Sequence, residues 1–184
     1  MTTLTSTFEL SKANFFVLLE RRISEKGDFP ALSKSIQSLR QLIHEEERNI
    51  ADIANAILGD FTLTQKVIKL VNSGMYAEAD QEITTISHAI AVLGLDTIIS
   101  IAHNVRTIDT LSAAKTASSV VCAELEKAFL ASDIAKSIVS KSNVTNGEEA
   151  IVCTQLHHLG RLILVFYFPE EWARIQQICG DRKS

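Results

Sequence analysis

The chain has 184 residues, of which 46% are hydrophobic and 22% are charged, and this balance suits one globular domain with a sizeable core. Its net charge of −4 argues against a nucleic-acid-binding protein, because such proteins neutralise phosphates with an excess of lysine and arginine. No apolar run approaches the roughly 18 residues of a membrane span, and the first residues lack the pattern of a signal peptide, so we expect a cytoplasmic protein without a membrane segment.

The hydrophobic pattern has the spacing of α-helices from the first element onward. Only 7 glycines and 2 prolines interrupt it, and the signals of β-hairpins are nearly absent. The first helix is predicted to follow Ser11 and to end near Gly27, and the second to begin at Pro30. The third carries the clearest amphipathic stripe, which consists of Ile50, Ile53, Ala54, Ile57 and Leu58.

The fourth predicted helix begins at a Thr-x-x-Gln pattern at residues 62–65, which is typical of a capping box. It ends at Asn72-Ser73-Gly74, where Gly74 is expected to take the left-handed conformation that closes many helices. Asn72 is expected to bind the following loop through its side-chain amide. A short helix then runs to Leu93-Gly94, and Asp96 is expected to cap the next one.

The C-terminal half is predicted to contain three helices. A long one runs to about Ser140, and its inner face consists of Leu125, Ala128, Phe129, Ser132, Ala135 and Val139. Asn146 begins the next helix, which carries His157, His158 and Gly160. Pro169 begins the last one, whose inner residues are Trp172, Ile175 and Cys179. Gly160, like Leu93-Gly94, is expected to allow a close helix approach or a cap. Together these elements predict an all-α, multi-helix orthogonal bundle.

Five motifs in the right order resemble those of the HDOD family, the catalytically degenerate relatives of HD-domain metal phosphohydrolases. They are Phe29-Pro30-Ala31-Leu32; Ile57, Asp60 and Leu63 of an Ile-x-x-Asp-Pro-x-Leu pattern, with Phe61 in place of the proline; Asn72-Ser73-Gly74-Met75-Tyr76; Ile83 to Gly94; and Leu156-His157-His158-Leu159-Gly160-Arg161-Leu162, followed by Phe168-Pro169. The resemblance implies an HD-domain-like fold for residues 29–184, with an N-terminal helix within residues 1–28 packed on it.

The same resemblance implies a function. It indicates a non-catalytic regulatory or output module in bacterial signal transduction, which acts through protein–protein contacts. Compared with the family, the chain is expected to be truncated at its C-terminal end. Apolar surface exposed by that truncation would suit a signalling partner or self-association as a homodimer.

Active HD enzymes hold metal through a histidine of an earlier helix, an adjacent His-Asp pair and a later aspartate. Here His158 stands at the position of the aspartate, and an imidazole cannot bridge two metal ions as a carboxylate does. No histidine lies around Glu124–Lys127, where the earlier ligand would fall. We therefore expect no catalytic residue, no bound metal and no cofactor. The alternative is a residual metal-dependent phosphohydrolase acting on a nucleotide or a phosphoester.

Two pairs of residues are further candidates. Cys153 and His157 lie four residues apart on a predicted helix and could form half of a zinc site. The other interpretation of the histidines is a buried His157 that hydrogen-bonds a polar group, with His158 at the surface. Met75 and Tyr76 are candidate partner contacts, because a flexible thioether beside an aromatic ring suits adaptable binding, and core packing is the alternative.

Overall fold

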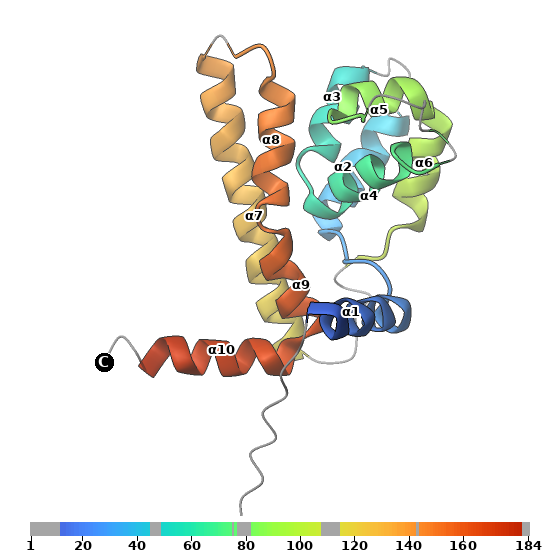
Figure 1. The fold of residues 1–184 in the computed structure, drawn as a ribbon. Helices are drawn as coiled ribbons and strands as arrows, with labels where there is room; N and C mark the ends of the chain where they lie inside the picture. The colour runs from blue at the N-terminus through green and yellow to red at the C-terminus, as the bar shows by residue number, and fades with distance from the viewer. Residues whose placement is uncertain are drawn as a thin grey trace, which may run out of the picture.

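The computed structural model describes residues 12–44, 49–74, 76, 82–107, 115–142 and 144–181. These residues form ten α-helices and no β-strand, which confirms the predicted all-α class (Figure 1). The helices are α1 (Lys12–Lys26), α2 (Ser33–His44), α3 (Ile50–Ile57), α4 (Phe61–Val71), α5 (Ile86–Leu93), α6 (Leu95–Asn104), α7 (Lys115–Lys141), α8 (Gly147–Leu156), α9 (Leu159–Tyr167) and α10 (Pro169–Asp181).

Two hydrophobic clusters hold the helices together. Helices α2 to α6 form a compact group, and α7 and α8 stand beside it as an antiparallel pair (Figure 1). The first cluster lies within this group and includes Ile151 and Val152 of α8. The second lies lower, where α1 and α9 meet the first half of α7, and includes Leu125, Leu162 and Phe168. The long helix α7 contacts both clusters, because Ala135 and Val139 pack against the first and Leu125 belongs to the second.

Helix α1 is fixed at the C-terminal end of α9 by charged and aromatic contacts. Arg22 and Lys26 donate hydrogen bonds to the carbonyl oxygens of Tyr167 and Phe166, at 2.6 and 2.9 Å. These carbonyls lie at the negative end of the α9 dipole, where cations are favourable. The guanidinium of Arg22 also lies 4.4 Å from the centre of the Phe168 ring.

The N-terminus of α4 is capped by Asp60 instead of the predicted capping box. The Asp60 carboxylate is only 2% exposed and accepts hydrogen bonds from the amides of Thr62 and Leu63. Thr62 is not the cap, because α4 already begins at Phe61, and its hydroxyl instead donates to the carbonyl of Pro30 at 2.9 Å. Asp60 also accepts from the amide of Leu32 at 2.9 Å. This carboxylate therefore ties the start of α2 to the start of α4.

The predicted role of Asn72 is confirmed. Asn72 is the C-cap residue of α4, and its side chain both donates to the carbonyl of Ile83, at 2.8 Å, and accepts from the Ile83 amide, at 2.9 Å. It also donates to the carbonyl of Ile68. The neighbouring Ser73 hydroxyl bonds the carbonyl of Leu70 and helps to close the helix. Asn72 thus joins the end of α4 to the segment that enters α5.

We expect Asn72→Ala to lower the free energy of unfolding by about 1–3 kcal/mol, because both backbone groups of Ile83 lose their partner in a half-buried setting. Asn104→Ala is the matched control, since the exposed Asn104 amide binds only within its own helix, to Ser100. That control should change stability by about 0.5 kcal/mol or less. Urea denaturation of both variants measures the difference, and equal effects would contradict the proposed link.

The glycines differ from the predictions in their backbone conformation. Gly94 has φ 78° and ψ 158°, a region that only glycine enters readily, and it joins α5 directly to α6. Gly74 has no positive φ, so the left-handed closure predicted there is wrong. The close approach predicted at Gly160 is also wrong, because a Cβ atom built there meets no atom within 4 Å. The local sequence does not show which of the three glycines adopts a positive φ, because each of them follows an apolar helical residue or a turn.

We therefore expect opposite effects from two matched substitutions. Gly94→Ala should destabilise by about 1–3 kcal/mol, through backbone strain alone, since a Cβ atom there also meets no neighbour. Gly160→Ala, at an exposed helical position, should be neutral or stabilise by up to about 1 kcal/mol. Thermal and urea unfolding measure the stability of both variants. A loss of stability in Gly160→Ala would contradict the open space found beside Gly160.

Asp96 was predicted to cap α6, but it lies in the first turn of that helix, and Gly94 occupies the N-cap position.

Several residues that were predicted to face inward are instead exposed. Ile50 and Phe129 are at the surface at the edges of their stripes. Ile175 and Cys179 are also exposed, because α10 extends away from the other helices after its first turns (Figure 1). The amphipathic pattern of α10 therefore has no covering partner within the described part of the chain.

One apolar stretch is longer than the sequence indicated. Gly147–Tyr167, which contains α8 and α9, is 21 residues long, and an 18-residue window within it has a mean hydropathy of 1.3, so it could cross a membrane by length and composition. The sequence prediction that no apolar run could span a membrane considered only uninterrupted runs. This stretch is interrupted by Glu148, Glu149 and Arg161. Residues from both of its halves belong to the hydrophobic clusters, and this packing accounts for the apolar composition.

Candidate functional site

The two histidines lie at the junction between α8 and α9, not within one helix as predicted. His157 is the C-cap residue of α8, and His158 immediately precedes α9. Their amides bind the carbonyls of Cys153 and Gln155, and the shift from an i−4 to an i−3 partner bends the chain there. The two rings are 6.0 Å apart and nearly perpendicular.

The burial of the histidines is the reverse of the prediction. His157 is exposed, and His158 is half-buried and interacts electrostatically with Glu124 and Lys127 of α7. Burial lowers the pKa of His158 below its ordinary value of 6.5, His157 lowers it further, and the negative charge of Glu124 opposes both. His158, at the position of the missing aspartate, is therefore the histidine that lies near the charged side chains of Glu124, Lys127 and Arg161.

The candidate zinc half-site does not gain further ligands. Cys153 and His157 are both exposed at the end of α8. Within the ranges that the structure describes, no group of three or more His, Cys, Asp or Glu side chains is arranged to hold a metal ion. Among the described residues, no further ligand therefore joins this pair.

A buried carboxylate occupies the place where the HD resemblance would put the earlier histidine ligand. Glu124 of α7 is only 4% exposed. Its Oε1 lies 2.7 Å from Nζ of Lys127, and its Oε2 lies 3.0 Å from Nε of Arg161 on α9. The second contact is ionic, since Oε2 accepts no aligned hydrogen bond in the described structure. We call Glu124, Lys127 and Arg161 the charge triad.

The charge triad lines an open cavity of about 460 Å³ between α7, α9 and α10. The guanidinium of Arg161 lies 5.1 Å from the centre of the Trp172 ring, which forms the α10 wall. Ser119, Val120, Ala123 and Gln176 complete the lining. This cavity offers one neutralised carboxylate, two cations and an aromatic ring.

The residues of this cavity do not fit a catalytic metal pair. Both oxygens of Glu124 already contact cations, and a divalent ion brought beside Lys127 and Arg161 would be repelled. His158 offers a single imidazole lone pair and cannot bridge two ions. The geometry therefore suits an ion network that joins α7 and α9.

The grouping of Glu124, Lys127, Arg161 and Trp172 into one site was not predicted from the sequence. A signal was present, because Glu124 is a charged residue on the stripe that also carries Val121, Leu125 and Ala128. A buried carboxylate requires a partner. Which cation supplies it depends on the packing of α9 against α7, and helical periodicity does not contain that information.

The other predicted positions are structural or remain predictions. Asp60, Asn72 and Ser73 bind backbone groups, and Pro169 is the first residue of α10, where its missing amide hydrogen costs nothing. Tyr76 is half-buried and packs against the first cluster, as the core-packing alternative expected. Met75 lies outside the described residues, so a partner contact at this pair stays a prediction.

This helical architecture defines the chain as an HD-like helical domain. The chain belongs to the HDOD family, since the model of the HDOD domain matches residues 29–184. No relative is found among curated proteins.

Solved structures are similar in fold. The MmoQ response regulator from Methylococcus capsulatus str. Bath (fragment 20–298) is 20% identical, with a TM-score of 0.60 over 80% of this chain and 56% of that chain. A virulence factor (cj0248) from Campylobacter jejuni subsp. jejuni is 18% identical, with a TM-score of 0.67 over 91% of this chain and 60% of that one. The chain therefore spans less than two thirds of the length of either protein.

Proposed function

We propose that this protein is a non-catalytic regulatory or output module of a bacterial signalling system, which acts in the cytoplasm through contacts with a signalling protein. The observation that carries the proposal is the charge triad, in which two cations neutralise the only buried carboxylate lining the cavity beside the histidines. A pocket built in this way holds α9 against α7 and does not gather metal ions.

Membership of the HDOD family supports the proposal, because catalytic activity is generally not established for that family. One of the similar folds belongs to a protein described as a response regulator, which is consistent with a place in signalling. The exposed apolar side chains of α7 and α10 offer surface for protein contacts.

Metal content and phosphodiesterase activity of the full chain, measured together in the presence of Mn²⁺, test the proposal. We expect substoichiometric metal after purification and hydrolysis no faster than that of the His157→Ala variant. Tightly held metal at one or more equivalents, with turnover that His157→Ala abolishes, would instead establish the alternative, a residual HD-type phosphohydrolase acting on a nucleotide or a phosphoester.

A further inference from the structure

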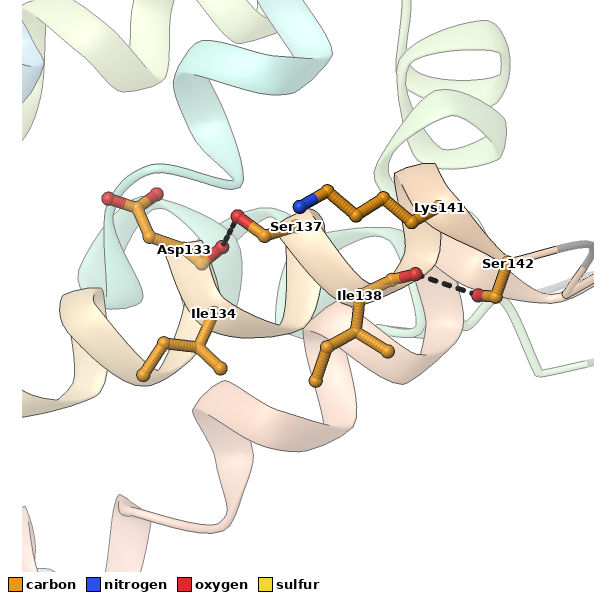
Figure 2. Close-up of a pocket in the computed structure, with 6 residues that line it drawn as sticks. All are labelled: Asp133, Ile134, Ser137, Ile138, Lys141 and Ser142. Carbon is orange, nitrogen blue, oxygen red and sulfur yellow. Dashed lines mark hydrogen bonds between the residues drawn. The ribbon is translucent and has the colours of Figure 1, made fainter.

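The outer face of α7 carries two parallel rows of side chains that line one shallow groove. The apolar row contains Leu130, Ile134 and Ile138, which are 60%, 54% and 60% exposed. The polar row contains Asp133, Ser137 and Lys141. Figure 2 shows Ile134 and Ile138 directed to one side of the helix, and Asp133, Ser137 and Lys141 along the other. Each row follows the i, i+4 spacing, so both run nearly along the helix axis.

We infer that this groove is the contact surface of a two-fold symmetric homodimer, in which α7 of one chain packs antiparallel against α7 of a second copy. The order of charges in the polar row indicates that the partner is a second copy of this chain. The polar row has an acid at one end, a small residue in the middle and a base at the other end, so it is complementary to itself only when reversed.

The geometry of the rows agrees with this arrangement. A two-fold axis through the level of Ser137, perpendicular to the helix, places Asp133 at the same level as Lys141 of the partner subunit, and the reverse pair forms by symmetry. The same axis lays the apolar row on the apolar row of the second copy. At a rise of 1.5 Å per residue, Ile134 and Ile138 of the two copies then alternate about 3 Å apart along the axis and can interdigitate.

A parallel arrangement would not satisfy the same groups. It would lay each polar row on the apolar row of the other copy, because a two-fold axis along the helix exchanges the two sides of the groove. It would also leave the charges without opposite partners. Within one chain, Asp133 and Lys141 are about 12 Å apart along the helix, which is too far for a direct ion pair.

Ser137 permits the close approach that this packing needs. Its hydroxyl is turned back to the carbonyl of Asp133, at 3.0 Å, so it presents no unsatisfied donor to the interface (Figure 2). Few apolar side chains are available per copy, and interfaces of that kind belong to the small, reversible class. We therefore expect a dimer that dissociates on dilution. This inference goes beyond the proposed function and does not depend on it. The groove and the cavity of the charge triad share no lining residue, so dimerisation does not depend on whether the cavity binds metal.

Sedimentation velocity of the full chain over a wide range of concentrations tests the inference. The wild type should shift reversibly from monomer to dimer, and Ile138→Asp should remain monomeric. At a concentration where the wild type is monomeric, Ile138→Asp should leave the helical circular dichroism and the melting temperature unchanged, because Ile138 is exposed in the monomer. Val17→Asp, at a 68% exposed position on α1, is the matched control and should dimerise as the wild type does.

Charge reversal tests the antiparallel arrangement itself. Lys141→Asp alone and Asp133→Lys alone should each weaken dimerisation by about tenfold or more, because each creates two like-charge pairs. The double variant, Asp133→Lys with Lys141→Asp, should restore it. A chain that stays monomeric at every concentration, a dimer insensitive to Ile138→Asp, or a double variant as weak as the single ones would each overturn the inference.

Discussion

Replacement of Asp60 by alanine is expected to lower the free energy of unfolding by about 2–4 kcal/mol, the largest effect that we predict. Three backbone amides, those of Leu32, Thr62 and Leu63, would lose their acceptor in a buried setting. Loss of the helix cap accounts for about 1 kcal/mol, and the unsatisfied Leu32 amide for about 1–3 kcal/mol more. Urea denaturation followed by circular dichroism measures the loss.

Asp60→Asn separates the two roles of this side chain. An asparagine keeps one oxygen for the Thr62 and Leu63 amides, but its NH₂ group would face the donor of Leu32. Burial raises the pKa of the Asp60 carboxyl, while its hydrogen bonds act to lower it, so removal of the charge relieves part of the desolvation cost. We expect an intermediate loss of stability. An asparagine variant as unstable as the alanine variant would assign the whole effect to the contact with Leu32.

Replacement of both Lys127 and Arg161 by methionine is expected to destabilise the fold by about 2 kcal/mol, because Glu124 would remain buried without a counter-charge. The estimate lies below the usual cost of breaking a buried pair, since both cations are about half exposed and water can reach their side of the contact. Equilibrium unfolding at neutral pH measures the change.

A third substitution provides the control. Addition of Glu124→Gln to the double variant removes the buried charge and should restore most of the lost stability. If the triple variant is as unstable as the double one, the loss comes from packing of the long side chains and not from an uncompensated carboxylate. If the double variant is as stable as the wild type, the charge triad has no structural role.

The charge triad also joins helices around the cavity through protein groups alone. In an HD enzyme the metal ions would join the helices around the pocket, because their ligands come from several helices. Here an ion pair from α7 to α9 makes a comparable link with protein groups alone. The adjacent Arg161–Trp172 contact extends that link to α10. We therefore expect the pocket region to depend on this network for its packing.

The sequence by itself determined the helical class and most helix positions, because the burial of one face leaves a 3.6-residue pattern in the chain. The stripe of α3, the end of α4 at Asn72 and the start of α10 at Pro169 all follow from residues within a few positions of each other. The Asn72 link was also predictable, since an amide at a helix end has few partners other than the next segment.

Only the tertiary structure decided which polar groups meet. Asp60 also accepts from the Leu32 amide, and the Thr62 hydroxyl donates to the Pro30 carbonyl, because the chain near Pro30 and Leu32 folds against α4. The exposure of His157 depends on the bend between α8 and α9, and the partner of Glu124 on how α9 packs against α7. The Leu32–Asp60, Pro30–Thr62 and Glu124–Arg161 contacts join residues 28, 32 and 37 positions apart, and a local pattern carries no information about contacts between such distant residues.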